Sequence, residues 1–107
     1  MKPIYSSLTD DPEILELVSM FVNEMPKRIA QFNALLESDD TKGLLNFAHQ
    51  LKGSAGSYGF AELSSAAAEI VSAIKNEKPK NKIIVLVKNL IELCNSASVK
   101  PKNVTFK

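Results

Sequence analysis

Apolar residues recur at spacings of three and four along almost the whole chain, and this period constrains the fold more than any other feature. A period of 3.6 residues places such side chains on one face of a helix. Prolines and short polar runs interrupt the pattern, while glycine occurs only four times in 107 residues. The sequence therefore predicts an all-α fold of amphipathic helices joined by short loops.

The interruptions divide the chain into five predicted helices. Pro26 ends the first helix and stands in the first turn of the second, because proline lacks the backbone donor that a helix interior needs. Gly59 ends the third helix. Residues 83–87 have strand propensity, but their helical spacing and the lack of a partner strand favour helix. The predicted helices span about 12–25, 26–37, 41–58, 61–76 and 82–97, and their predicted N-caps are Asp11, Asp40 or Thr41, and Asn81.

These helices should pack as an antiparallel four-helix bundle with an additional short or kinked N-terminal helix. We expect a single domain over residues 1–107, with a core at about 12–97 and a flexible tail at 98–107. The predicted inner faces carry Ile14, Leu17, Val18, Phe21 and Val22; Ile29, Phe32, Leu35 and Leu36; Leu44, Ala48, Leu51 and Ala55; Leu63, Ala67, Ile70 and Ile74; and Ile83, Val87, Leu90 and Cys94.

Charge and composition narrow the choice of partners. The net charge is +1 and no basic patch stands out, so we expect no nucleic-acid partner. No apolar run approaches the roughly 18 residues of a membrane span, so we expect no membrane partner. The lone Cys94 excludes an intrachain disulfide and fits the cytoplasm. Because the chain has one histidine and one cysteine, we expect no metal site, and we expect no cofactor.

The only histidine, His49, lies in the predicted third helix. The predicted core stripe of that helix falls within roughly 60° on a helical wheel, and His49 projects roughly 130° from its middle. We therefore expect an exposed imidazole. The competing interpretation is an incidental surface histidine.

The face around His49 combines a cation, an apolar side chain and two glycines. Leu45 precedes it by one turn, Lys52 and Gly53 follow by one turn, and Gly56 follows by two. A glycine inside a helix costs about 1 kcal/mol relative to alanine. The simplest reason for this cost is steric clearance, which lets another protein bring a reactive group to the imidazole. An exposed Leu45 would suit docking of that protein.

An exposed imidazole is partly neutral at physiological pH, and neutral imidazole is a good nucleophile. His49 could therefore accept a phosphoryl group from an acyl phosphate and pass it on. Lys52 would supply charge for the phosphoryl oxygens, because phosphoryl transfer depends mainly on positioning and electrostatic stabilisation.

The run His49–Ala55 (HQLKGSA), followed by Gly59, resembles the signature of histidine-containing phosphotransfer (HPt) domains. The resemblance covers about 12–97, and its upstream part is carried by Phe21, Glu24, Pro26 and Leu35. It implies a phosphorelay intermediate without kinase activity of its own. The expected partners are response-regulator receiver domains and hybrid histidine kinases.

The resemblance also assigns roles to residues of this chain. It implies that His49 is the phosphoacceptor, that Lys52 stabilises phosphoryl charge, and that Gln50 offers a hydrogen bond near the site. Gly53 would leave room for the partner. The spacing around His49, rather than the resemblance, indicates that Gly56 and Leu45 also contribute to partner contact.

Two positions depart from the family pattern. The family often has glutamate where this chain has Val71, with Glu69 nearby, and an aliphatic residue where it has Tyr58. We expect both departures to lie away from the reactive face.

Other chemistries fit less well. The glycines of residues 53–59 lack the Gly-Lys-Ser/Thr ending and the preceding strand of a phosphate-binding P-loop. The main alternative is a helical protein–protein interaction module without phosphotransfer.

Overall fold

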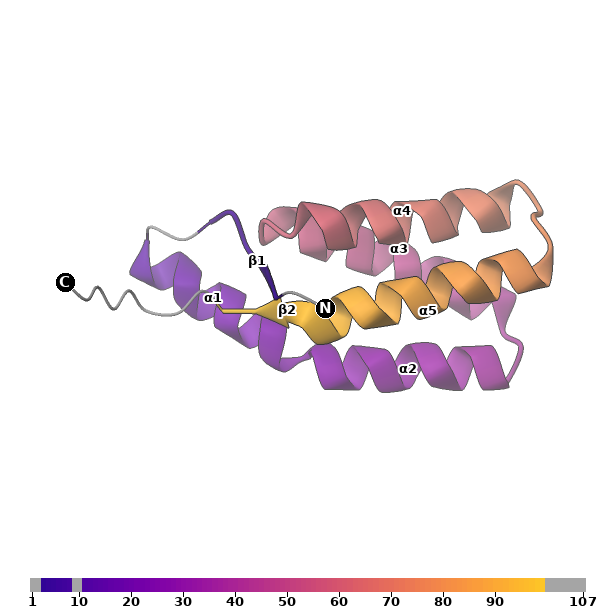
Figure 1. The fold of residues 1–107 in the computed structure, drawn as a ribbon, viewed down its shortest axis with the longest axis horizontal. Coiled ribbons are helices and arrows are strands. Elements are labelled where there is room, and N and C mark those ends of the chain that lie inside the picture. Colours follow the sequence, from indigo (N-terminus) through magenta and orange to yellow (C-terminus); the bar gives the residue numbers. More distant parts are fainter. Residues whose placement is uncertain (1–2, 9–10, 100–107) are drawn as a thin grey trace.

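Five helices follow one another in the computed structural model, which describes residues 3–8 and 11–99 (Figure 1). Helices α2 to α5 run alternately up and down along the long axis, and α1 stands at one end of them. The predicted all-α architecture, a four-helix bundle with an additional N-terminal helix, is confirmed. The bounds are α1 (Pro12–Asn23), α2 (Met25–Glu37), α3 (Thr41–Ser57), α4 (Ala61–Lys75) and α5 (Lys80–Ser96).

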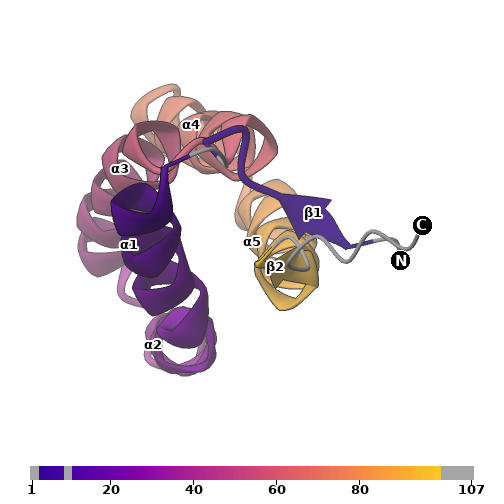
Figure 2. The ribbon, with the colours of Figure 1, turned by 90° about the vertical axis from the view of Figure 1, so that its left-hand side faces the viewer.

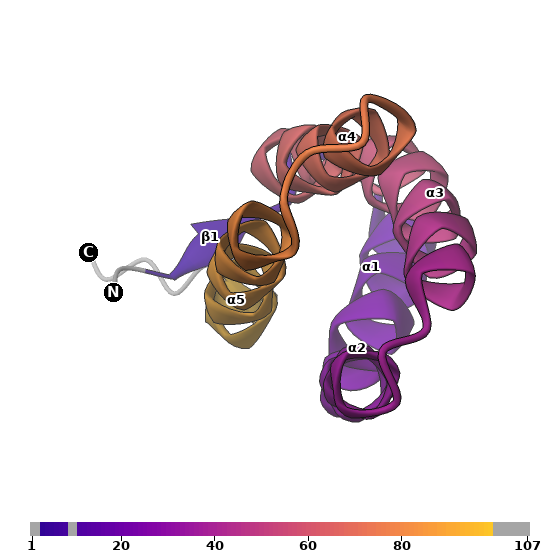
Figure 3. The ribbon, with the colours of Figure 1, turned by 90° about the vertical axis from the view of Figure 1, so that its right-hand side faces the viewer.

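The bundle encloses one apolar core. Helices α3 and α4 pack most extensively, followed by α4 and α5, while α2 contacts both α3 and α5. Figure 3 looks along the bundle and shows these four helices arranged around the core. The largest fully buried side chains are Phe32, Phe60, Leu51, Leu63, Ile70, Leu90, Val18, Val87 and Cys94.

The buried stripe of α3 agrees with its prediction and sets the rotation of the helix. Leu44 is 4% exposed, and Ala48, Leu51 and Ala55 are fully buried. Fully burying a leucine side chain contributes about 1.5–3 kcal/mol. The helix therefore keeps the orientation that leaves His49 exposed.

Side-chain caps begin two of the helices as predicted. The Asp11 carboxylate accepts a hydrogen bond of 2.9 Å from the Glu13 N–H, and the Asp40 carboxylate accepts one of 2.8 Å from the Gly43 N–H. Each cap contributes about 1 kcal/mol, because it satisfies a donor that has no partner inside the helix.

The prediction of Asn81 as a cap is wrong. Helix α5 begins at Lys80, and the carbonyl of Pro79 accepts the first N–H groups, from Lys82 at 3.0 Å and Ile83 at 3.2 Å. The extended backbone of Pro79 provides this start without a side-chain hydrogen bond.

The buried face of α1 is also narrower than predicted. Val18 and Phe21 are buried, but Leu17 is 47% exposed. Because α1 lies beyond the end of the bundle, it has fewer helices to pack against than α2 to α5 do.

The sequence did not predict the short parallel pairing of β1 (Ile4–Tyr5) with β2 (Ala97–Ser98). Ser98, predicted to belong to a flexible tail, pairs with Tyr5. Residues 100–107 of that predicted tail lie outside the described residues. Figure 2 shows β1 beside the end of α5. Residues 4 and 5 thus lie beside the end of the last helix.

The residues around β1 form a strap, which we define as residues 3–8, across the turn between α3 and α4. Ser6 is buried, and its hydroxyl donates to the Tyr58 carbonyl at 2.5 Å. The Ser7 N–H donates to the Gly59 carbonyl at 2.9 Å. Gly59 has φ +81°, and a Cβ there would stand 2.9 Å from the Ser7 nitrogen. The close approach of the strap therefore requires glycine at this position.

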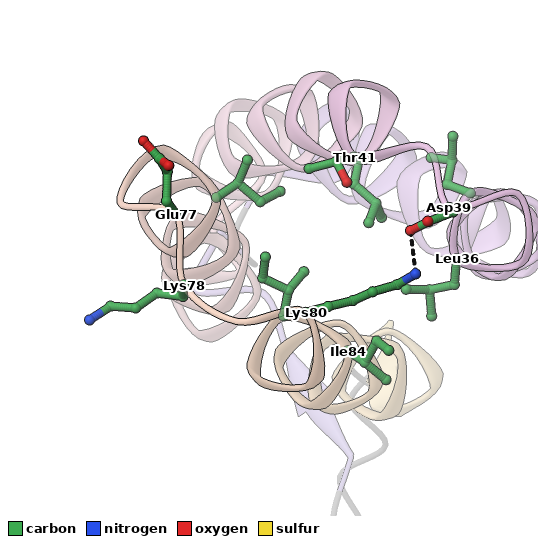
Figure 4. A pocket seen from close by; sticks show the side chains of 11 residues that line it. Leu36, Asp39, Thr41, Glu77, Lys78, Lys80 and Ile84 are labelled. Carbon is green, nitrogen blue, oxygen red and sulfur yellow. Dashed lines mark ion pairs between the residues drawn. The ribbon is translucent and has the colours of Figure 1, made fainter.

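A cavity of about 390 Å³ lies at the opposite end of the bundle (Figure 4). Its walls are mainly leucine and isoleucine side chains, and an ion pair of 2.5 Å joins Lys80 Nζ to Asp39 Oδ1 at its edge. Both partners are well exposed, so this pair adds less than about 1 kcal/mol to stability. The cavity contains none of the predicted site residues.

None of the helices in the described part of the chain has the length and apolar character needed to cross a membrane.

Candidate functional site

An open hollow of about 650 Å³ lies on the surface beside His49. The outward face of α3 forms most of it, and α2 and the turn after α3 complete it. Three of the predicted site residues, His49, Gln50 and Gly53, come together here. The full lining, which we call the His49 hollow, is Arg28, His49, Gln50, Gly53, Ser54, Ser57 and Tyr58.

Gly53 leaves free space in this hollow. A Cβ added there would have no atom within 4 Å apart from the local backbone of its own helix. Packing inside the protein therefore does not explain the glycine. The open space is consistent with the steric clearance inferred from the sequence.

Gly56 has different surroundings from Gly53. An added Cβ would stand 3.4 Å from the Ser64 hydroxyl of α4, and this hydroxyl donates to the Lys52 carbonyl at 2.9 Å. Gly56 thus lies where α3 meets α4 and does not line the His49 hollow. Its predicted part in partner binding stays a prediction.

Leu45 is half-buried against the core, so the expectation that it is exposed is wrong. Leu45 follows directly after the buried Leu44, and its side chain packs in part against the apolar core. Its role in partner contact remains a prediction.

The polar groups at the site have few internal partners. Lys52 is exposed one turn after His49 but does not line the hollow. Within residues 3–8 and 11–99, no hydrogen bond or ion pair involves the side chains of His49, Gln50 or Lys52. The imidazole and the ammonium group are therefore available to an incoming anion.

Arg28 of α2 lines the hollow, and sequence reasoning did not identify it. Its Nη2 lies 3.4 Å from Glu24 Oε1, and its guanidinium carbon stands 5.4 Å from the centre of the Phe21 ring. It is the only arginine among 13 basic residues. That rarity was the signal available in the sequence, because arginine suits bidentate binding of anions better than lysine does.

Tyr58 also lines the hollow, so the expectation that it lies away from the reactive face is wrong. Helix α3 ends at Ser57, and Tyr58 is its C-cap. A helical wheel places residues 49 and 58 on opposite faces, but it no longer applies where the helix ends. The other departure from the family pattern, Val71, is buried in the core.

Cys94 is a core residue and takes no part in the site. Its burial raises the pKa of the thiol to about 11, and the nearby positive charge of Arg28 offsets only part of this rise. A protonated thiol is a poor nucleophile. Among the described residues, no group of three or more His, Cys, Asp or Glu side chains could hold a metal ion.

The comparisons with known proteins give one match. The sequence model of the Hpt domain matches residues 16–95, about three quarters of the chain. No curated protein and no solved structure matches. Hpt domains carry out histidine phosphotransfer in two-component phosphorelays, where they interact with receiver domains and histidine kinases and act as carriers, not kinases. The matched range contains all of α2, α3 and α4 together with the His49 hollow, and the chain belongs to the Hpt domain family.

Proposed function

We propose that this protein is a phosphorelay intermediate. His49 accepts a phosphoryl group from the phospho-aspartate of one receiver domain and passes it to the aspartate of another. The observation that carries the proposal is the exposed His49 beside a hollow in which Gly53 leaves open space. A receiver must bring its own reactive carboxylate close to the imidazole, and this space permits that approach.

In the forward step, one imidazole nitrogen of His49 attacks the phosphorus of the acyl phosphate. The N–P bond forms as the P–O bond to aspartate breaks, the aspartate leaves as a carboxylate, and the other ring nitrogen releases its proton to solvent. The second transfer reverses these changes on a new aspartate. We assign no kinase activity to the protein, since both steps use a phosphoryl group that is already activated.

The neighbouring polar groups assist the transfer. The Lys52 ammonium, one helical turn from His49, stabilises charge on the phosphoryl oxygens. Gln50 lines the hollow and offers a side-chain N–H to the same oxygens. We place the protein in the cytoplasm, where a lone buried thiol such as Cys94 stays reduced.

A reconstituted relay tests this function. One receiver domain is phosphorylated, a second receiver that cannot take phosphoryl from it directly is added, and the label on the second is followed with time. The proposal expects label on the second receiver only when the protein is present, and none with His49→Gln. A protein that binds both receivers but carries no label would instead be the alternative, a helical interaction module without phosphotransfer.

A further inference from the structure

A second surface depression adjoins the His49 hollow. It is smaller, about 180 Å³, and runs along α1, so we call it the α1 groove. The two depressions share Arg28, Ser54 and Tyr58. The α1 groove adds Leu17 and Met20, which are 47% and 58% exposed. One continuous surface therefore leads from the histidine, across a cation and an aromatic ring, to two exposed apolar side chains.

Phe21 packs against Arg28 and Tyr58, two of the residues shared by the depressions. The centre of its ring lies 5.2 Å from that of the Tyr58 ring and 5.4 Å from the Arg28 guanidinium carbon. The strap fixes the backbone of Tyr58 through the Ser6 hydroxyl. Side chains that are ordered before binding lose less conformational entropy when a partner docks.

Arg28 keeps much of its hydrogen-bonding capacity. A guanidinium has five N–H donors. In the described part of the chain, its only side-chain partner is Glu24, at a long 3.4 Å, and its buried Nε has none. The Arg28 side chain is 18% exposed, and that of Glu24 is 57% exposed. A carboxylate from another protein can therefore compete for the guanidinium and bind it through two parallel hydrogen bonds.

We infer that Arg28 and Tyr58 anchor the receiver domain on this surface and determine how tightly it binds. This inference rests on the proposed function, which supplies the partner. A receiver that presents a phosphorylated aspartate is anionic at the point of contact, which complements Arg28. Its apolar residues would cover Leu17 and Met20 in the α1 groove. Arginine and tyrosine are also the residue types that most often carry the binding energy of an interface.

The docking surface then lies on a different side of α3 from the one expected from the sequence. Gly56 stands beside Ser64 of α4, whereas Arg28 belongs to α2 and lines the α1 groove together with Tyr58. A receiver that covers the His49 hollow on this side also contacts the α1 helix, where Leu17 and Met20 are exposed and line the α1 groove.

Affinity measurements separate docking from chemistry. The dissociation constant is measured for a receiver domain activated with beryllofluoride, which mimics the phosphoryl group but cannot transfer it. Arg28→Gln and Tyr58→Ala should each weaken binding roughly tenfold. Tyr58→Phe, which keeps the ring, should bind nearly as the wild type does. Lys88→Gln, which removes an exposed cation on α5, is the matched control and should bind normally.

The outcomes distinguish the two proposals. Unchanged affinity for both Arg28→Gln and Tyr58→Ala overturns the inference, as does a receiver that fails to bind the wild type. Thermal unfolding shows whether each variant still folds, and Arg28→Gln, which keeps a polar side chain with good helix propensity on α2, provides the answer if Tyr58→Ala does not fold. If Arg28→Gln and Tyr58→Ala weaken binding as expected but the wild type takes up no phosphoryl group from a phosphorylated receiver, the docking inference holds and the proposed function is wrong.

Discussion

Replacing Gly53 by alanine should stabilise the protein while slowing phosphotransfer. The residue lies inside α3, and a Cβ there meets nothing within 4 Å outside the local helix backbone. Alanine is favoured over glycine in a helix interior by about 0.5–1 kcal/mol, and nothing in the fold reduces this gain. For a domain of this size, the gain raises the melting temperature by roughly 2–8 °C.

The same methyl group enters the space through which a receiver reaches His49. Phosphoryl transfer needs the attacking nitrogen and the phosphorus in line, and a displacement of about 1 Å can slow such a reaction up to roughly 100-fold. Gly53→Gln places a longer side chain in the same space with a helix propensity close to that of alanine. We therefore expect the transfer rate to fall from wild type to Gly53→Ala and to fall further in Gly53→Gln.

Thermal unfolding and single-turnover transfer from a phosphorylated receiver measure the two effects on the same samples. Asn89→Ala is the control, because it raises helix propensity at an exposed position of α5 that lies outside the His49 hollow. It should raise stability and leave transfer unchanged. A Gly53→Ala protein that is no more stable, or a Gly53→Gln protein that transfers at the wild-type rate, would refute the clearance argument.

Three further predictions concern stability. Gly59→Ala should lower the free energy of unfolding in urea by about 1–3 kcal/mol, because a φ of +81° is unfavourable for alanine and the new Cβ would clash with the Ser7 nitrogen. A smaller loss would show that the strap moves aside at little cost. Asp40→Ala should cost about 1 kcal/mol in the same assay, since the cap on the Gly43 N–H is lost. Burial raises the pKa of the Cys94 thiol to about 11, so the folded state holds this proton more tightly than the unfolded chain, and stability falls as pH rises from about 9 to about 11. Over that range, the free energy of unfolding of the wild type should fall by roughly 2–3 kcal/mol more than that of Cys94→Ala. Parallel curves of unfolding free energy against pH for the two proteins would contradict the burial of the thiol.

The helices and the exposure of His49 were predictable from the sequence because they depend on local rules. The buried stripe of α3 follows from the helical period, and the carboxylates of Asp11 and Asp40 cap the helices that the pattern delimits. Pro26 and Gly59 mark helix boundaries through backbone restrictions that any chain shares. The side of α3 that carries His49 could thus be inferred without any tertiary contact.

Features that depend on contacts between distant residues were not predictable in this way. The pairing of β1 with β2 joins segments more than 90 residues apart and involves two residues of each. Such short segments carry no periodic signal. The strap, and with it the requirement for glycine at position 59, follows from this pairing and from the Ser6 hydrogen bond to Tyr58.

The composition of the site was predictable only for residues that α3 itself provides. Arg28 comes from α2, and Tyr58 comes from the turn after α3, where the helical wheel ends. The half-burial of Leu45 depends on how the neighbouring helices pack against α3, which the apolar period of α3 does not specify. Helix faces could therefore be inferred from spacing, whereas the surface between helices required the fold.

The most direct test of this account is the identity of the phosphorylated residue. The protein is incubated with a phosphorylated receiver domain, and the bound phosphoryl group is tested for acid and base stability and mapped by peptide mass spectrometry. We predict an acid-labile, base-stable group on the peptide that contains His49 and no uptake by His49→Gln. An unlabelled wild-type protein, or equal labelling of His49→Gln, would contradict the assignment of His49 as the phosphoacceptor.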